Sequence, residues 1–407
     1  MRVLLINNRH FRGGGADVVY FTTGELLEST GHEFVYFSRH SNDAEKNEFD
    51  TFFAPDLSKT GVFKRTYCYF NNTYAAAALD RLLDKEHFDI AHAHLMWGGM
   101  TAAIIPVLHK HGVPLVHTVH DYRMVCPAYT FRNGNGIVCE RCKGGHFMQC
   151  FKYRCSKGNS LESLIMAGEM FYRNRKWHPA KNLDGIIYVS RFAKEKHEEI
   201  DPLFRNTLNT VLYNFTTVGE QCPPVETDGG YYLYYGRLSY EKGIKTLLDV
   251  FACRPELKLF VVGSGPIEEE LKKKKSSNIE FFGFKSGKEL YDIVRNARFV
   301  CLPSEWYENN PMTVVEAYSM GVPVIGAKIG GIPEIIVDGE TGFLFESGSA
   351  ESFERALDKS LAMEANDYVA MKHRALQFAE SNFNKDVYVR RLLAFYSEVI
   401  DSFDDGE

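Results

Sequence analysis

Short apolar runs recur along the whole chain, and longer segments with helical spacing of their apolar residues separate most of them. The runs lie at residues 2–7, 34–37, 88–94, 114–121, 185–190 and 211–214, and again at residues 231–235, 257–262, 279–282, 299–302 and 323–327. Continuous apolar runs of this length are typical of strands buried on both faces of a parallel sheet. Their alternation with helices therefore predicts an α/β protein built from βαβ units.

The series of strands has one interruption, at residues 216–230. Cys222-Pro223-Pro224 and Asp228-Gly229-Gly230 fall in it, a composition typical of a linker. We therefore expect two doubly wound Rossmann-like domains, residues 1–215 and 231–382, which face each other across a ligand-binding cleft. Residues 383–407 are expected to form an amphipathic helix, at 386–400, and a disordered acidic tail at 401–407.

Composition narrows the class of function. The 407-residue chain has a net charge of −6, so we expect no nucleic-acid partner. No apolar run approaches the length of a transmembrane helix, and the apolar residues 3–6 are too short for a signal peptide. Nine cysteines, an odd number, favour a reducing compartment over a disulfide framework. We therefore expect a cytoplasmic protein.

The most informative stretch is residues 303–316, which follow a buried apolar run. Asn310 is a favourable N-cap and Pro311 suits the first helical position, so a helix is predicted to begin there. The free N–H groups of its first turn and the helix dipole would attract an anion such as a phosphate. Glu308 and Glu316 flank this position, where their carboxylates would bind sugar hydroxyls. The alternative is an ordinary connection with solvated glutamates.

In the first half, glycines and histidines lie where predicted strands end. Gly13-Gly14-Gly15 would let a ligand approach the backbone closely, although they are not the Gly-x-Gly-x-x-Gly dinucleotide fingerprint. His92 and His94 alternate onto one face of their strand, where they would either pack as polar groups or bind a metal. His120 ends the next strand, at the edge where open α/β sheets bind ligands, and we interpret it as a ligand contact. The alternative for the three glycines is a flexible turn without a ligand, and the alternative for His120 is an ordinary strand end.

Five of the nine cysteines lie together in an insertion at residues 126–158. Cys139 and Cys142 form a Cys-x-x-Cys pair, and with Cys150 and Cys155 they have a spacing that resembles a small closed zinc site. Free or disulfide-forming cysteines and a redox pair are the alternatives, although no thioredoxin-like βαβ context surrounds the pair. The fifth is Cys126, and the spacing does not fix which four would bind zinc.

Residues 152–176 hold six basic residues against two acidic ones, with apolar and aromatic side chains between them. A helix of this kind would lie against an anionic membrane surface. The alternative is a helix that packs on its own domain and leaves a basic face in water.

In their order along the chain, several motifs resemble those of glycosyltransferase family 4, the retaining nucleotide-sugar enzymes of the GT-B fold. The resemblance covers nearly the whole length, and the ordered set is specific although each motif alone is weak. The motifs are Gly13-Gly14, His120-Asp121, Gly236-Arg237-Leu238 with Lys242-Gly243, Val262–Pro266, Glu308 and Glu316, and Gly330-Gly331 with Pro333-Glu334.

The resemblance implies a role for each site residue. Arg237 and Lys242 would hold the donor diphosphate. Glu308 would bind hydroxyls of the donor sugar, and Glu316 those of the ribose. The N–H groups of Met312 and Thr313 would contact the diphosphate, and Gly14 and Gly15 would contact the phosphates. The backbone around Phe284 would contact the base, and His120 the sugar. Gly265 and Asn310 would also belong to the donor site. The final helix, from residue 383, would cross back to the first domain.

The resemblance also implies catalysis without a metal. No two aspartates are spaced Asp-x-Asp, the pattern with which other sugar transferases hold a divalent metal on the diphosphate. Arg237, Lys242 and the helix dipole can replace that metal. Retention would follow from front-face attack, in which the leaving diphosphate accepts the acceptor's proton and Glu308 positions the sugar.

One departure from the family pattern bears on the substrate. Where many members have Glu-Gly-Phe-Gly, this chain has Glu308-Asn309-Asn310-Pro311, and Pro311 removes one N–H donor, so contacts to the sugar would differ. This form, and the run His120–Pro127 with the cysteines after it, resemble the branch that assembles capsular polysaccharide and exopolysaccharide.

We therefore expect a transferase at the inner face of the cell membrane. It would move a sugar from a UDP- or GDP-sugar to a lipid-linked precursor of a capsule, exopolysaccharide or O-antigen. The alternatives are transfer to a small soluble acceptor, a nucleotide-sugar 2-epimerase or phosphorylase on the same fold, and a zinc-stapled interaction protein without catalysis.

Overall fold

The computed structural model describes residues 1–225, 228–273 and 276–406. The chain forms two compact units. The N-terminal unit comprises residues 1–212 together with the chain from Val389 on, and the C-terminal unit comprises residues 213–388. These bounds differ by a few residues from the division at 215 and 383 that the sequence suggests.

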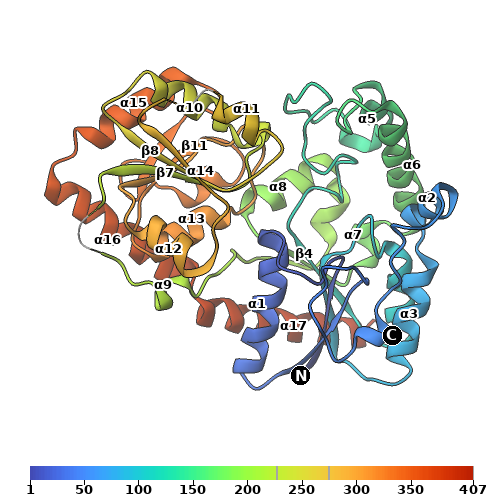
Figure 1. Cartoon of the computed structure of the whole chain (residues 1–407). Helices are drawn as coiled ribbons and strands as arrows, with labels where there is room; N and C mark the ends of the chain where they lie inside the picture. The colour runs from blue at the N-terminus through green and yellow to red at the C-terminus, as the bar shows by residue number, and fades with distance from the viewer. Residues whose placement is uncertain (226–227, 274–275, 407) are drawn as a thin grey trace. The chain divides into compact units, whose positions relative to one another are not determined.

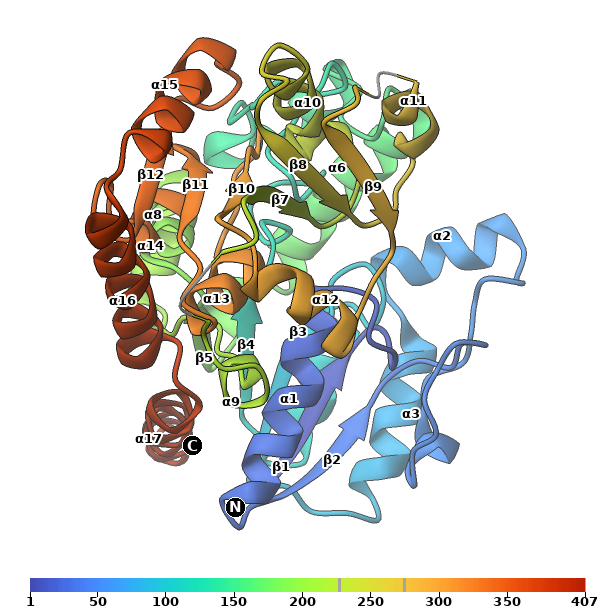
Figure 2. The same cartoon turned by 60° about the vertical axis from the view of Figure 1, so that its left-hand side comes forward.

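The N-terminal unit is built on a fully parallel sheet with the strand order β2-β1-β3-β4-β5-β6 (Figure 2). The apolar runs of the first half supply these strands, which confirms the predicted α/β class; only the last run is displaced, since β6 ends where it was expected to begin. The strands are β1 (Arg2–Asn7), β2 (Glu33–Phe37), β3 (Ile90–Leu95), β4 (Leu115–Val119), β5 (Gly185–Tyr188) and β6 (Asn209–Val211).

Helices connect these strands, and α1 packs against β1, β2 and β3. The last helix, α17, belongs to this unit from Val389 on, and its Tyr396 hydroxyl lies 2.6 Å from His92 Nδ1 of β3. The helices are α1 (Gly15–Ser29), α2 (Val62–Phe70), α3 (Thr73–Leu83), α4 (Ile105–Lys110), α5 (Met148–Lys152), α6 (Ser160–Lys176), α7 (Pro179–Asn182), α8 (Arg191–Ile200) and α17 (Lys385–Asp404), with short 3-10 turns at Asp50–Phe52, Ala102–Ile104, Lys143–Gly145 and Pro202–Asn206.

The C-terminal unit repeats the architecture with the strand order β12-β11-β10-β7-β8-β9, again fully parallel. Its helices lie on both sides of the sheet, with α10 and α15 on one side and α12 and α13 on the other (Figure 1). The strands are β7 (Tyr231–Tyr235), β8 (Lys258–Val262), β9 (Ile279–Gly283), β10 (Phe299–Leu302), β11 (Val324–Ala327) and β12 (Gly342–Phe345). The helices are α9 (Val218–Gln221), α10 (Ile244–Ala252), α11 (Glu268–Lys272), α12 (Gly287–Arg295), α13 (Met312–Ser319), α14 (Ile332–Ile335), α15 (Ala350–Leu361) and α16 (Ala365–Asn382), with a 3-10 turn at Tyr240–Lys242.

The burial of β7 explains why its sequence is a continuous apolar run. Tyr232 and Tyr234 enter one hydrophobic cluster, and Leu233 and Tyr235 enter another. Successive side chains of a strand point to opposite faces, so both faces of β7 are covered. Burying the strand on both faces contributes to stability through the apolar area removed from water.

In each sheet, the chain adds strands first on one side of its first strand and then on the other side, so the first strand has a neighbour on both sides. β1 lies between β2 and β3, and β7 lies between β8 and β10. At such a switch of direction the connecting loops diverge and leave room for a ligand beyond the carboxyl ends of the strands. The topology therefore places a candidate site after β7 and β10, and another after β1 and β3.

Four expectations about secondary structure need correction. Residues 216–230 are not a bare linker, because α9 forms there and buries Val218 and Cys222 in the core of the C-terminal unit. The helix expected over 152–176 begins only at Ser160, and α5 precedes it. Residues 401–404 of the expected disordered tail are helical, since α17 continues to Asp404. The series of apolar runs, which ended at 323–327, was incomplete, because the structure adds a further strand, β12, from Gly342 to Phe345. Residues 226–227 and 407 lie outside the described residues.

None of the helices that the structure describes is long and apolar enough to cross a membrane.

Candidate functional site

Two loops meet at the carboxyl ends of β7 and β10. Gly243 has a φ of 67°, and a Cβ there would lie 1.8 Å from the carbonyl oxygen of Pro303. The N–H of Glu305 donates to the carbonyl oxygen of Glu241 at 2.9 Å. Since only glycine permits this approach, the loop after β7 and the loop after β10 form one continuous surface.

Glu308 is buried in the loop after β10, with 6% of its surface exposed. Its Oε1 accepts hydrogen bonds from Lys242 Nζ at 2.7 Å, Ser304 Oγ at 2.7 Å and Trp306 Nε1 at 2.8 Å. Burial would raise the pKa of Glu308, but the Lys242 ammonium and the three hydrogen bonds outweigh it and lower that pKa. Glu308 is therefore an ionised carboxylate held in a fixed orientation, a geometry suited to positioning hydroxyl groups.

The two predicted phosphate-binding cations differ in their surroundings. Lys242 is part-buried, bonded to Glu308, and its Nζ lies 5.0 Å from the centre of the Trp306 ring. Arg237 is exposed, and its guanidinium has no hydrogen bond or ion pair within the described part of the chain. Arg237 is thus the cation of this surface with all its donors unused.

The helix after the acidic loop begins one residue later than predicted. Pro311 is the N-cap of α13, not its first residue, and Asn310 does not cap the helix. Instead Asn310 Oδ1 accepts a hydrogen bond from the N–H of Asn214, and its backbone oxygen accepts one from Asn214 Nδ2. The loop is therefore anchored to the start of the C-terminal unit, and the helix starts without a side-chain cap.

The first turn of α13 leaves backbone donors unused. The earliest bond of the helix joins Val314 N–H to the carbonyl oxygen of Pro311 at 3.0 Å. The N–H groups of Met312 and Thr313 have no acceptor among residues 1–225, 228–273 and 276–406. Two free N–H groups at the positive end of a helix dipole can bind a phosphate.

Glu316 lies on the same helix, one turn after Met312. It is part-buried, and its Oε2 accepts a hydrogen bond from the Tyr235 hydroxyl at 3.3 Å. Burial raises the pKa of Glu316 to about 7, and the Tyr235 hydroxyl offsets this only in part. Near neutral pH the carboxyl therefore changes readily between its neutral and ionised forms.

Glycines bring the loop after β8 and the segment after β11 against this site. A Cβ on Gly265 would lie 2.2 Å from the carbonyl oxygen of Leu238, so Gly265 packs its backbone on the loop after β7. A Cβ on Gly330 would lie 2.3 Å from the Glu308 carbonyl oxygen, which also accepts the N–H of Gly331 at 2.7 Å. Because a Cβ would clash at these positions, glycine is what allows the four loops to converge. Phe284, after β9, is 71% exposed.

In the N-terminal unit, the glycine-rich turn follows β1. Gly14 is the N-cap of α1 in an extended conformation, and Gly15 is the first residue of the helix. Both glycines are exposed, whereas Asp17 in the first turn is buried and accepts a hydrogen bond from Asn7 Nδ2 at 2.9 Å. Burial raises the pKa of Asp17 more than Asn7 and Arg9 lower it. The backbone of the turn is therefore accessible at a helix N-terminus.

The predicted histidines form a stack at the ends of β3 and β4. The ring centres of His92 and His94 lie 4.3 Å apart, on the same side of β3 as predicted, and the rings of His94 and His120 are stacked at 5.3 Å. His94 Nδ1 lies 3.0 Å from His120 Nε2. Burial lowers the pKa of His92 and of His120 to about 3. His120 is therefore a neutral imidazole in this structure, and His94 supports it.

The predicted cysteine ligands lie near one another in the N-terminal unit but do not converge. Cys142 and Cys150 are buried in one small core with Phe147. Among the residues that the structure describes, Asp80, Asp84 and His111 are the group of three whose ligand atoms all lie within 4.8 Å of one another. No three of the sulfurs of Cys126, Cys139, Cys142, Cys150 and Cys155 reach that separation. The zinc site stays a prediction.

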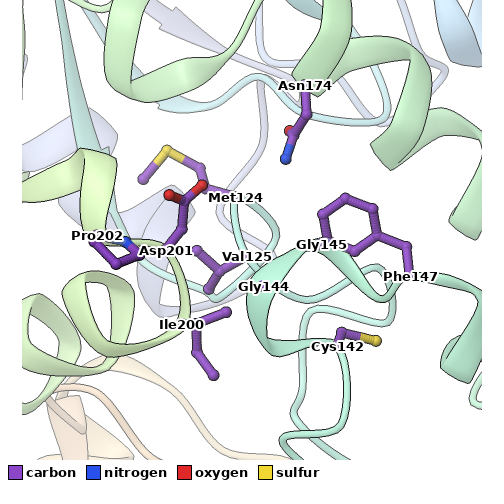
Figure 3. Close-up of a pocket in the computed structure, with 10 residues that line it drawn as sticks. All are labelled: Met124, Val125, Cys142, Gly144, Gly145, Phe147, Asn174, Ile200, Asp201 and Pro202. Carbon is purple, nitrogen blue, oxygen red and sulfur yellow. The ribbon is translucent and has the colours of Figure 1, made fainter.

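A cavity of about 250 Å³ opens beside the cysteine-rich segment (Figure 3). Asn174 of α6 points into it, and its Oδ1 is buried with no hydrogen-bond partner among the described residues. Asp201 also lines the cavity, but it is engaged with His178 Nε2 at 2.8 Å and with the N–H of Leu203. The cavity belongs to the N-terminal unit alone and lies outside the predicted donor-binding set.

Sequence reasoning missed the side chains that hold the site residues. Ser304, Trp306 and Tyr235 each bond a predicted carboxylate, and His94 bonds His120. Ser304 and Trp306 lie within four residues of Glu308 in the sequence. Polar residues so close to a predicted functional carboxylate could have been recognised as its hydrogen-bond partners. Nothing local marks Tyr235, because it appears only as part of the apolar strand β7.

Two family models match the chain in succession. The one described as Glycosyltransferase Family 4 matches residues 13–216, and the one described as Glycosyl transferases group 1 matches residues 222–378. Together they span both units and most of the motifs that carry the predicted site.

Among curated proteins, the chain is similar to an uncharacterised 42.6 kDa protein of the cps region of Klebsiella pneumoniae, with 22% identity over 82% of this chain and 87% of that protein. It is also similar to the lipopolysaccharide 1,2-N-acetylglucosaminetransferase of Salmonella typhimurium, with 32% identity over 48% of this chain and 58% of that protein.

Among solved structures, sucrose-phosphate synthase from Thermosynechococcus elongatus superposes with a TM-score of 0.72 at 17% identity, covering 99% of this chain and 100% of that one. Anabaena HepE in complex with UDP and glucose superposes with a TM-score of 0.70 at 15% identity, covering 98% and 100%. These similarities show the fold.

Proposed function

The chain belongs to glycosyltransferase family 4 and is a glycosyltransferase of the GT-B type, and from this premise we propose that it transfers a sugar from a nucleotide sugar to a precursor of a surface polysaccharide, with retention of configuration and without a metal. The observation that carries the proposal is the arrangement of Lys242, Glu308 and the start of α13 beyond the carboxyl ends of β7 and β10.

On the donor side, the diphosphate binds to Arg237, Lys242 and the free N–H groups at the start of α13. Arg237 brings an unpaired guanidinium and Lys242 a point charge already fixed by Glu308. Glu316 receives the ribose hydroxyls, and the backbone around Phe284 contacts the base. The complexes of HepE with UDP and with UDP-glucose favour a uridine nucleotide over a guanosine nucleotide.

Bond cleavage places negative charge on the leaving diphosphate, and the cations and helix dipole stabilise that charge in the transition state. Glu308 orients the sugar through its hydroxyls. Its lowered pKa makes it a weak nucleophile, and since its three hydrogen bonds all go to Oε1, the Oε2 atom is the one that meets the sugar hydroxyls. The acceptor hydroxyl therefore attacks from the face that the diphosphate leaves, and the departing phosphate oxygen takes its proton. Within the N-terminal unit, His120 after β4 and Gly14 and Gly15 after β1 are proposed as ligand contacts of that unit.

The acceptor is a glycan of the capsule, exopolysaccharide or O-antigen type, carried on a lipid. The relatives from the Klebsiella cps region and the Salmonella lipopolysaccharide transferase support this class. The enzyme then acts at the inner face of the cell membrane.

A surface of the N-terminal unit has the chemistry for that location. α2 and α5 both pack against α6. Apolar side chains on all three helices remain exposed, up to 93% for Phe63: Val62, Phe63 and Tyr67 on α2, Met148 and Phe151 on α5, and Leu161, Leu164 and Phe171 on α6. Exposed cations lie among them, including Lys64, Arg65 and Lys152, although Arg173 of α6 is buried in an ion pair with Glu169. We call this the α2–α6 surface; apolar and basic groups together bind anionic membranes.

The test is a panel of UDP- and GDP-sugars, with binding measured first and release of nucleoside diphosphate measured second. Acceptors are vesicles that contain a polyprenyl-diphosphate-linked sugar and, in parallel, soluble polyols. We expect one UDP-sugar to be used with the lipid-linked acceptor, with the anomeric configuration retained and no loss of rate in EDTA. An inverted product, a requirement for a divalent ion, or turnover with the polyol alone would contradict the corresponding part of the proposal.

A further inference from the structure

Arg123 lies three residues after His120, in the loop that follows β4, and no role has been given to it. Its side chain is part-buried. Its guanidinium makes one hydrogen bond, from Nη1 to the Tyr69 hydroxyl at 3.3 Å, and no carboxylate lies within 4.0 Å of it among the described residues. A guanidinium carries five donors, so this one holds most of its hydrogen-bonding capacity in reserve.

The surroundings hold Arg123 in one position. Its backbone N–H donates to Asp121 Oδ1 at 2.9 Å, and its carbonyl oxygen accepts from the buried Arg173 Nη2 at 2.8 Å. The guanidinium carbon lies 4.4 Å from the centre of the Tyr129 ring. Tyr129 itself has a φ of 54°, an uncommon conformation for a residue with a side chain. A cation fixed at both ends of its backbone and along its side chain is organised in advance for a ligand.

Glycine keeps the space beside this cation open. Gly98 has a φ of 73°, and a Cβ there would lie 3.0 Å from Arg123 Nη1. The nearest acidic group along the chain, Asp121, is part-buried; burial raises its pKa, and the Arg123 guanidinium opposes that effect. The Asp121 carboxylate is bonded to the backbone N–H of Arg123 and not to its guanidinium. Glu169 is engaged with Arg173 at 2.8 Å. Both carboxylates act on the guanidinium through space and help to raise the pKa of Arg123, yet neither forms a direct ion pair with it among the described residues.

A part-buried guanidinium with most of its donors unused and no direct ion pair is well suited to bind an anionic ligand. We propose that Arg123, with the Tyr69 hydroxyl, forms an anion site of the N-terminal unit that binds a phosphate group of the acceptor. The planar guanidinium presents parallel donors to two phosphate oxygens, and the hydroxyl donates a third hydrogen bond. Tyr69 belongs to α2, the helix that carries Phe63, Lys64 and Arg65 on the α2–α6 surface, so the site and part of that surface share one helix.

The site deepens the proposed function, on which its assignment to the acceptor rests. A phosphate can come from two sources: the head of a polyprenyl-phosphate carrier, or a phosphorylated soluble glycan. Both present the same oxygens to Arg123, and the experiment has an arm for each.

The first arm measures the binding of inorganic pyrophosphate by calorimetry to protein saturated with UDP, so that the donor site is occupied. We expect binding that Arg123→Gln weakens at least about tenfold and Arg123→Lys weakens less, because lysine supplies charge but not the planar pair of donors. Tyr69→Phe, which removes one hydroxyl and nothing else, should weaken it several-fold. Arg81→Gln, which removes an exposed cation of α3 in the same unit, is the matched control and should leave it unchanged.

The second arm compares sedimentation with phosphatidylcholine vesicles that contain or lack a polyprenyl phosphate. Retention that requires both the lipid phosphate and Arg123 identifies the carrier; Arg123-dependent pyrophosphate binding with no vesicle difference identifies a soluble phosphorylated glycan. The proposal is overturned if UDP-saturated wild type does not bind pyrophosphate, or if Arg123→Gln and Tyr69→Phe, folded by circular dichroism, bind it like wild type. If UDP itself fails to bind while pyrophosphate binding depends on Arg123, the proposed function fails and the anion site remains.

Discussion

Lys242 and Glu308 come from loops that follow different strands, and Lys242 Nζ lies 2.7 Å from Glu308 Oε1. The pair joins the group proposed to hold the diphosphate to the group proposed to hold the sugar. Lys242 has two further N–H donors with which to meet a phosphate. The bond to Glu308 fixes its position before a ligand arrives, so that little reorganisation accompanies binding. Each residue thus depends on the other.

Replacing Lys242 by alanine should remove both effects. The diphosphate loses a charge, and Glu308 loses the cation that outweighs its burial, so the pKa of Glu308 should rise. We expect sugar transfer to fall by about 100-fold or more. Because Glu308 is then buried without its ion pair, the free energy of unfolding should also fall by about 1–3 kcal/mol. Initial rates of nucleoside diphosphate release and chemical denaturation measure the two.

Lys245→Ala is the matched control. Lys245 is an exposed lysine in the first turn of α10, three residues further along the chain, and its removal changes the net charge equally. We expect its rate and stability to match those of wild type. Equal rates for Lys242→Ala and Lys245→Ala would refute the phosphate-binding role of Lys242.

Glu316 should make nucleotide binding release protons. Its pKa is raised to about 7, mainly by burial, and ribose hydroxyls that donate to it would favour the ionised form and lower that pKa. Binding of UDP at pH 6 should therefore release up to about one proton per chain, and at pH 9 almost none. Calorimetry in buffers of different ionisation enthalpy measures this release. Because the terminal phosphate of UDP also titrates near pH 6, the measure is the difference between the two proteins: Glu316→Gln should release fewer protons than wild type, and equal release by both would contradict the ribose assignment.

The same group predicts a pH dependence of stability without ligand. A carboxyl whose pKa is raised on folding contributes fully below its unfolded pKa, and that contribution is lost as the pH rises through about 7. Glu316→Gln should therefore match wild type at pH 4 and unfold at a higher temperature at pH 8.5. The gain should be about 1 kcal/mol, because the side chain is only part-buried and solvent weakens the effect. A variant that is less stable at pH 8.5 would contradict the burial argument.

The sequence was sufficient for most of the fold because burial on both faces leaves a continuous apolar run at each strand. β12 escaped because the segment Gly342–Phe345 is short and starts with glycine. The structure explains that glycine: a Cβ on Gly342 would lie 2.0 Å from the carbonyl oxygen of Val324 on β11. The segment 216–230 was misjudged for a different reason. Its prolines and glycines indicate turns, but they do not reveal that Val218 and Cys222 are buried between them.

The positions of Arg237, Lys242 and Glu308 could be predicted because each follows a predicted strand, while their roles toward a donor stay predictions. The helix start could not be predicted, because Asn310 finds a tertiary partner in Asn214 that outcompetes capping. Capping preferences describe an isolated helix, and two hydrogen bonds from a residue 96 positions away changed the outcome. Tyr235 and His94 also act through contacts distant in sequence, which no local pattern records.

The zinc prediction has a direct measurement. Burial raises the pKa of Cys142 to about 12, so its thiol on its own is neutral, and zinc binding would deprotonate the ligands and draw the sulfurs together. We expect about one zinc per chain in protein purified without added metal. Cys139→Ser with Cys142→Ser should lose it, while Cys253→Ser, at an exposed cysteine of the C-terminal unit, should keep it. A content below about half an equivalent would count against the site.

The α2–α6 surface predicts how the protein meets a membrane. Phe63 is 93% exposed, and Lys64 and Arg65 beside it have no acidic neighbour within α2. Burying the ring among acyl chains and the cations against anionic headgroups should act together. At low salt we expect co-sedimentation with vesicles that contain anionic lipid, weakened about fivefold or more by Phe63→Ser and by Lys64→Glu.

Val369→Ser is the control, since Val369 is an exposed apolar residue of α16 in the C-terminal unit. Raising the salt should weaken binding of wild type, because the Debye length falls to about 3 Å at 1 M. Equal sedimentation of Phe63→Ser, Val369→Ser and wild type would exclude this surface, whereas failure of wild type to sediment at low salt would exclude the membrane location itself.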